Sequence, residues 1–204
     1  MDMAGAEKLM KQKAFIKREL EREVGQAQAD AIWSAATRRL EGILRDHADL
    51  PKGVRLHTDN YIFSSAAIYL AAKDAIGQEA AYRVVENAAI RRTEGMGRKL
   101  AGLMRLPGMK GLFLRMWDPL TRKVFSANNG FTNVFYPREK GAYRMDVTAC
   151  PYCRYFTELG CFELTKVFCA NDDRCYGSLP GLEFRRAGTL GRGADRCDFY
   201  MRKL

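Results

Sequence analysis

One stretch of sequence decides how the second half of the chain folds: Tyr143-Arg144-Met145-Asp146-Val147-Thr148-Ala149-Cys150-Pro151-Tyr152-Cys153. Residues 143–148 are typical of a strand. Pro151 favours the first turn of a helix, because its backbone angle is already fixed near the helical value and it has no N–H group to leave unpaired. We therefore expect a strand that passes directly into a helix after Cys150.

The elements around this stretch alternate between strand and helix. A turn over 137–141 separates the strand from an earlier one, and Gly160 and Gly177 mark the ends of two helices. Residues 110–116 fit a short helix or a strand equally well. The further predicted strands cover 131–136, 182–186 and 197–202, the last two joined by a turn over 188–193, and the predicted helices cover 151–160 and 162–176.

The first half of the chain predicts helices only. Gly25 and Gly77 are suitable helix ends, and Gly95 and Gly97 weaken the last helix by up to about 1 kcal/mol each, so a kink is expected there. The predicted helices cover 6–23, 27–47, 61–76 and 78–104. This order predicts the α+β class, an N-terminal helical region followed by an antiparallel sheet packed with helices.

Length and composition fit one globular domain. The 204 residues are expected to form a single α+β domain, in which 1–108 are a mainly helical scaffold and 109–204 are the cysteine-containing α+β part. No apolar stretch is long enough for a membrane span, and the N-terminus lacks the features of a secretory signal. We therefore predict a cytoplasmic protein whose cysteines are reduced.

The formal net charge of +10 is unevenly distributed, because nine Lys and Arg residues and only two acidic residues lie between Arg91 and Lys123. Such a segment can attract an anionic partner, but a solvated helix face is the favoured interpretation. Nucleic acid is not expected as a partner, because no zinc-finger, RRM or helix-turn-helix signature accompanies the charge.

All six cysteines follow residue 149. Cys150 and Cys153 have the C-x-x-C spacing of redox dithiols and of half a zinc site, but zinc would need a second pair, and no histidine follows His57. Buried thiols that act as small hydrophobic groups are the alternative, above all for Cys153, Cys161 and Cys175. The metal question therefore stays open.

Cys169 and Asp172 are three residues apart on a predicted helix and therefore share a face. A carboxylate cannot lower the pKa of a neighbouring thiol by charge attraction, so a catalytic pair would use the acid to move a proton and the thiol to react. Metal ligation and a plain core position are the alternatives. His57, followed by Thr58 and Asp59, is interpreted as an ordinary loop histidine.

The second half resembles the L-2-amino-thiazoline-4-carboxylic acid hydrolase family over roughly residues 131–204. The matching positions are Asp146-Val147-Thr148, Cys150-Pro151, Glu158-Leu159-Gly160, Glu163-Leu164, Phe168-Cys169 with Asp172, Arg186, Thr189-Leu190, Gly193 and Cys197-Asp198-Phe199. The residues from Gly193 to Phe199 are also similar to the end of ligand-binding domains of the 4-vinyl reductase type.

The resemblance implies a hydrolase that opens a small cyclic C–N substrate to a carbamoyl-cysteine. It implies catalytic roles for Cys150, Cys169, Asp172 and Cys197, without showing which cysteine is the nucleophile. Arg186 is the expected partner of a substrate carboxylate, because its planar fork suits bidentate binding.

The 4-vinyl reductase likeness implies an alternative, a non-catalytic module that binds or senses a small molecule. Some sensors of that type hold zinc with an acid and cysteines near the closing motif. Here Arg186 and Thr189 stand at the corresponding positions in place of an acid and a cysteine, so a zinc site of that type is not favoured. The sequence does not show whether a cofactor is needed. The expected partner is a small, anionic substrate, and the sequence leaves homo-oligomerisation open.

Overall fold

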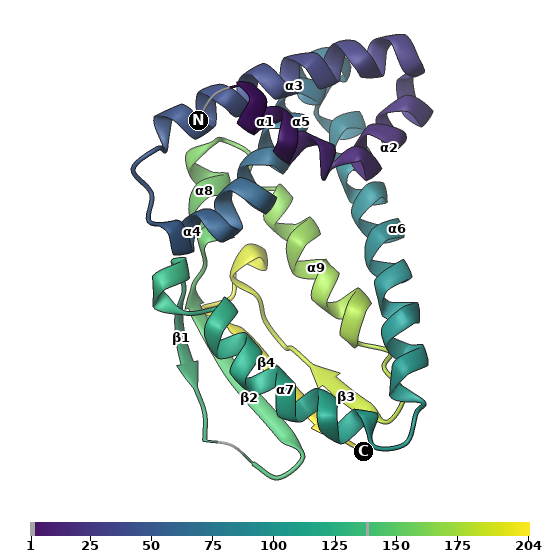
Figure 1. The fold of residues 1–204 in the computed structure, drawn as a ribbon, viewed down its shortest axis with the longest axis vertical. Helices are drawn as coiled ribbons and strands as arrows, with labels where there is room; N and C mark the ends of the chain where they lie inside the picture. The colour runs from purple at the N-terminus through teal and green to yellow at the C-terminus, as the bar shows by residue number, and fades with distance from the viewer. Residues whose placement is uncertain (1–2, 138) are drawn as a thin grey trace.

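A computed structural model describes residues 3–137 and 139–204. The first half contains helices alone (Figure 1): α1 (Met3–Lys11), α2 (Ala14–Val24), α3 (Gln26–Asp46), α4 (Lys52–His57), the π-helix η1 (Thr58–Phe63), α5 (Ser64–Ile76) and α6 (Gln78–Met104). The second half adds α7 (Met109–Val124), the 3-10 helix η2 (Ala127–Asn129), β1 (Thr132–Phe135), β2 (Ala142–Ala149), α8 (Pro151–Glu158), α9 (Leu164–Tyr176), β3 (Leu182–Arg185), the 3-10 helix η3 (Leu190–Arg192) and β4 (Cys197–Lys203).

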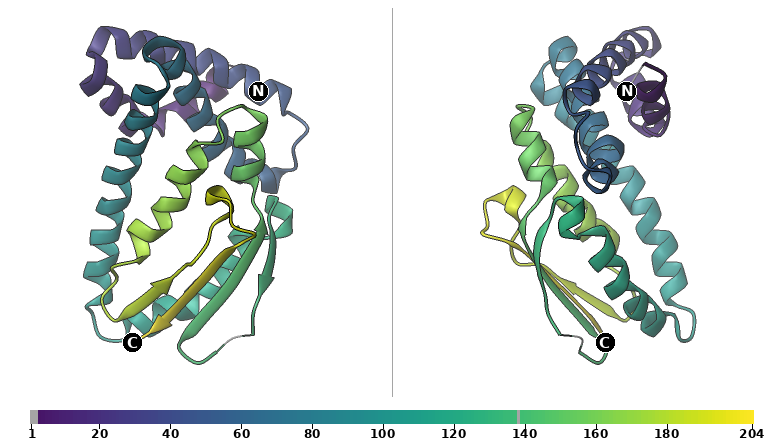
Figure 2. Two further views of the ribbon diagram at one scale, coloured as in Figure 1. Left: turned by 180° about the vertical axis from the view of Figure 1, so that it is seen from behind. Right: turned by 60° about the vertical axis from the view of Figure 1, so that its left-hand side comes forward.

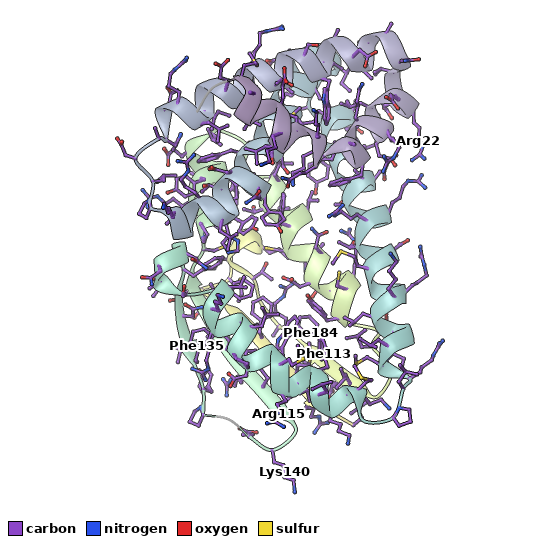
Figure 3. The ribbon with its side chains drawn as sticks, in the orientation of Figure 1. Arg22, Phe113, Arg115, Phe135, Lys140 and Phe184 are labelled. Atoms are coloured by element: carbon purple, nitrogen blue, oxygen red, sulfur yellow. The ribbon has the colours of Figure 1, made fainter. Side chains whose placement is uncertain are left out.

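The predicted α+β class is confirmed. The four strands form one antiparallel sheet in the order β1-β2-β4-β3. One face of the sheet carries alternate apolar residues of β2 and β4, and α7 crosses this face (Figure 2). Figure 3 shows Phe113 of α7 beside Phe184 of β3, and both belong to the cluster that fills this interface.

The helical half and the sheet half share one core. Its largest buried cluster joins the N-terminal helices, from Ala6 to Ala88, to residues of α8 and α9 that include Tyr155, Phe156 and Val167. The long helix α6 descends from the helical layer and runs beside α9 (Figure 1). Because apolar side chains of both halves pack together, residue 108 does not separate two independent cores.

Close helix packing explains one glycine that the sequence marked as a weak point. A Cβ atom at Gly97 would lie 3.1 Å from the backbone oxygen of Arg174 in α9. Gly97 therefore permits α6 and α9 to approach closely, and α6 continues through it as a helix.

Several elements differ from the sequence expectation, among them α4, which no predicted helix covers. The predicted helix over 6–23 is divided into α1 and α2, because both pieces pack against α3 and the chain must turn at Gln12 and Lys13 to let them do so. Residues 110–116, which fitted a helix or a strand, belong to α7. Among the described residues, no helix combines the length and apolar character that crossing a bilayer requires.

Candidate active site

A cavity of about 350 Å³ lies between α9, α6, the sheet and the helical layer. Its walls include all five candidate residues named from the sequence, Cys150, Cys169, Asp172, Arg186 and Cys197. Residues more than 40 positions apart in the chain thus meet around one space. The helical half also lines the cavity, so the expectation that it is only a scaffold is incomplete; its contributions include Lys13, Phe15, His57, Tyr61 and Arg92.

The family-matched motif Cys197-Asp198-Phe199 is explained by the alternation of side chains along β4. Cys197 and Phe199 line the cavity, whereas the Asp198 carboxylate accepts hydrogen bonds from the backbone N–H groups of Ala187 (3.2 Å) and Gly188 (2.7 Å). Burial alone would raise the pKa of Asp198, but these N–H groups lower it overall. Asp198 therefore fixes the loop that follows Arg186.

Arg186 lies directly after β3, and its side chain is only 1% exposed. Its guanidinium contacts Asp172 Oδ2 at 2.7 Å, Asp173 Oδ1 at 2.9 Å and the backbone oxygen of Cys169 at 2.5 Å. It also lies 5.0 Å from the ring centre of Phe199. A role in binding a substrate carboxylate stays a prediction, and in the structure the fork of Arg186 is already occupied by two carboxylates.

Asp172 has the most perturbed carboxyl group of the site. Burial raises its pKa from 3.8 to about 6, although Arg186 acts in the opposite direction and Asp173 adds to the rise. The Asp172 side chain is 33% exposed, and the residue lines the cavity. A ligand in the cavity can therefore reach its carboxyl group. A carboxyl group with a pKa near 6 can accept and release a proton at neutral pH.

The cysteine thiols divide into one easily ionised group and several resistant ones. Cys150 donates a hydrogen bond to Cys153, which lowers the pKa of Cys153 and raises that of Cys150. Cys153 also lies in the first turn of α8, where the helix dipole favours a negative charge. Burial raises the pKa of Cys169, and that of Cys197 to about 11. Cys153, which the family resemblance does not match, is thus the thiol best suited to ionise.

Two contacts fix the loop that carries η3 against the site. The backbone N–H of Leu190 donates to Cys197 Sγ at 3.2 Å. A Cβ atom at Gly191 would lie 2.9 Å from both Cys169 Sγ and Thr165 Cβ. Only glycine therefore allows the loop to approach α9 this closely without displacing Cys169.

His57 is buried in the cavity wall, in contrast to the expected ordinary loop histidine. Its Nε2 lies 3.1 Å from the backbone oxygen of Val124 and its Nδ1 lies 3.2 Å from the hydroxyl group of Tyr152. Burial lowers the pKa of His57, so the ring is neutral, donates from Nε2 and accepts from Tyr152. Asp59 pairs instead with Arg55 at 3.0 Å. Both ring nitrogens are engaged, so His57 shapes the cavity.

Asn171 is a polar residue that the sequence did not single out. It lines the cavity, and its buried Oδ1 has no hydrogen-bond partner among the described residues. A buried acceptor without a partner is costly, and a ligand N–H group would satisfy it.

All six cysteines are free thiols. No group of three or more His, Cys, Asp or Glu side chains is placed to hold a metal ion within the described parts of the chain. The open metal prediction therefore gains no support from side-chain geometry.

One comparison with known proteins gives a match. The family model described as L-2-amino-thiazoline-4-carboxylic acid hydrolase matches residues 55–201. The match begins well before residue 131, so it includes α5, α6 and α7 as well as the motifs of the second half. No curated protein and no solved structure gives a significant match to the chain. Because the family model covers most of the sequence, the chain belongs to the L-2-amino-thiazoline-4-carboxylic acid hydrolase family.

Proposed function

We propose that the protein is a hydrolase that opens a small cyclic C–N substrate such as 2-amino-thiazoline-4-carboxylate, giving a carbamoyl-cysteine. The observation that carries this proposal is the convergence of Cys150, Cys169, Asp172 and Cys197 on one cavity of about 350 Å³. Its volume suits a small heterocycle. The free cysteines agree with a reducing compartment, and we therefore propose a cytoplasmic location.

Asp172 is the proposed general base. Its carboxylate takes a proton from water while the water oxygen bonds to the ring carbon between nitrogen and sulfur. The double bond of that carbon to nitrogen becomes single, and the nitrogen takes the proton that Asp172 has accepted. One ring bond of the resulting tetrahedral carbon then breaks as its C=O bond forms. The hydroxyl proton passes to Asp172, the departing heteroatom takes a proton from Cys169, and Asp172 returns its proton to the Cys169 thiolate. Arg186 positions Asp172 for this task through the 2.7 Å contact.

Cys169 is the proposed proton donor to the departing heteroatom. Its pKa is raised by burial, so the thiol keeps its proton at neutral pH, and it lies one helical turn from Asp172 on α9. We propose that Cys150 and Cys197 hold neighbouring groups in place, through the hydrogen bonds to Cys153 and from Leu190.

A covalent route through Cys153 is the second candidate, favoured by the lowered pKa of this thiol. In this route the Cys153 thiolate bonds to the same ring carbon and the ring opens. Water activated by Asp172 then replaces the thiolate, which leaves as Cys153.

Turnover of 2-amino-thiazoline-4-carboxylate, followed by mass spectrometry of the carbamoyl-cysteine product, tests the proposal. Asp172→Asn and Cys169→Ala should abolish turnover, whereas Cys161→Ala, whose thiol lies in the helical core outside the cavity, should not. Loss of turnover in Cys153→Ala with a trapped adduct in the parent would favour the covalent route. Binding of thiazolines without any turnover would refute the enzyme and favour the non-catalytic binding module.

A further inference from the structure

We propose that Lys13 and Arg92 form the binding site for the carboxylate of the ligand, a proposal that rests on the proposed function. Both side chains line the cavity, Lys13 from the break between α1 and α2 and Arg92 from α6. The helical layer that carries Lys13 lies at the end of the molecule away from the sheet (Figure 1).

The two cations lack the partners that neighbouring cations have. Close by, Lys17 contacts Asp30 at 2.6 Å and Arg91 contacts Glu19 at 2.9 Å. In the parts of the chain that the structure describes, neither Lys13 nor Arg92 has a carboxylate within 4.0 Å. Each instead lies over an aromatic ring, Lys13 at 4.9 Å from the Tyr61 ring centre and Arg92 at 4.6 Å from that of Phe15.

This arrangement is unfavourable in the absence of an anion. The Lys13 residue is only 6% exposed, and burying an ammonium group without a counter-ion is costly. Burial and the charge of Arg92 together lower the pKa of Lys13 from 10.5 to about 8. A carboxylate between the two cations would accept hydrogen bonds from both and would remove their mutual repulsion.

Carboxylates surround Arg186, whereas the opposite end of the proposed ligand site carries Lys13 and Arg92. This difference in charge orients the ligand. Asp172 and Asp173 already occupy the guanidinium of Arg186, and Arg192 lies 3.7 Å from Asp173, so the cations in this part of the cavity are already paired with carboxylates. Asp172 and the unpartnered Oδ1 of Asn171 can instead accept hydrogen bonds from N–H groups of a ligand. We therefore expect a small dipolar ligand, with its amidine-like nitrogens near α9 and its carboxylate near Lys13 and Arg92.

Lys13 also lies outside the family match, which begins at residue 55. The carboxylate site is thus built partly from a segment that the family model does not describe. On this view, the N-terminal helices of this chain contribute to substrate selection.

Calorimetric binding and steady-state kinetics test the proposal with two ligands. These are 2-amino-thiazoline-4-carboxylate and the same ring without the carboxylate. Lys13→Met and Arg92→Met should each weaken binding of the carboxylated ligand about 30-fold, equivalent to about 2 kcal/mol at 1.4 kcal/mol per tenfold, and should raise KM more than they lower kcat. Binding of the uncharged ring should change less than about threefold. The matched control is Arg98→Met, on the same helix, with a side chain that is 75% exposed and outside the cavity.

Equal losses for both ligands, or a parent protein that binds the acid no better than the uncharged ring, would overturn the carboxylate site. Because Arg92 is exposed, Arg92→Met keeps the test valid if Lys13→Met does not fold. A parent that binds the acid but never hydrolyses it would refute the proposed function, while the ratio of the two affinities would still decide for or against Lys13 and Arg92.

Discussion

Lys13→Met should increase the stability of the ligand-free protein at neutral pH. Methionine keeps most of the apolar stem of this buried lysine and removes an ammonium group that lines the cavity and has no carboxylate partner among the described residues. A lysine retained for folding would show the opposite behaviour, because its loss would remove favourable contacts. Stability therefore separates a structural lysine from one retained to bind a ligand.

The expected gain is about 3 kcal/mol. Lowering the pKa of Lys13 from 10.5 to about 8 corresponds to this free energy at roughly 1.4 kcal/mol per pH unit. For a chain of this length, such a gain raises Tm by roughly 6–12 °C. Apolar contacts of the new methionine would add to it and imperfect packing would reduce it.

The sign of the pH dependence follows from proton counts. Between pH 8 and pH 10.5 the unfolded lysine is protonated and the folded one is not, so the parent protein gains stability as pH rises through this range. Arg92 and Tyr61, the polar groups that face Lys13, are present in both proteins, but the repulsion between Lys13 and Arg92 exists only in the parent and is part of the measured difference. Urea unfolding at pH 7 and pH 10 measures the difference in the free energy of unfolding between parent and variant. A variant less stable than the parent at pH 7, or a difference that is the same at both values, would refute the reasoning.

Four further predictions concern the cavity. The kcat/KM of the parent should rise about tenfold per pH unit below pH 6 and level off above it, because the pKa of Asp172 is about 6 and the base form is active; a flat profile would exclude this role. Gly191→Ala should cost about 1–3 kcal/mol of stability and most activity, since its Cβ would lie 2.9 Å from Cys169 Sγ; full activity would show that the loop can move. Arg186→Lys should lower kcat equally for carboxylated and uncharged substrates, and a selective loss for the acid would return the carboxylate site to Arg186. Thiol titration of anaerobically prepared, unfolded protein should find all six cysteines reduced, whereas two or fewer would contradict the reducing compartment.

Local sequence signals were sufficient for most of the fold. Pro151 and Gly160 bracket α8, and Gly77 separates α5 from α6, because these residues fix or free the backbone where a helix must begin or end. The break at Lys13 could not be predicted, since residues 6–23 all favour a helix and the interruption comes from packing against α3.

The sequence predicted site residues only in the second half of the chain. Cys169, Asp172 and Cys197 were recognised from spaced motifs, but their distances and pKa values depend on burial by elements far away in the chain. Lys13 had one overlooked signal: it follows Ala6 and Met10 on the buried face at helical spacing, where an apolar residue is expected. A lysine on the buried, apolar face of a helix is rare unless its charge is paired.

The shared core has a consequence for how the chain can be shortened. A fragment limited to residues 55–201 would keep every family motif but would lose α3, which packs along α5. The side of α5 that α3 covers would then be exposed to water, and α5 is mostly apolar and almost completely buried. Such a fragment should aggregate or unfold, because an apolar face of this kind must be covered. The limits of sequence similarity and the limits of autonomous folding therefore fall at different residues in this protein.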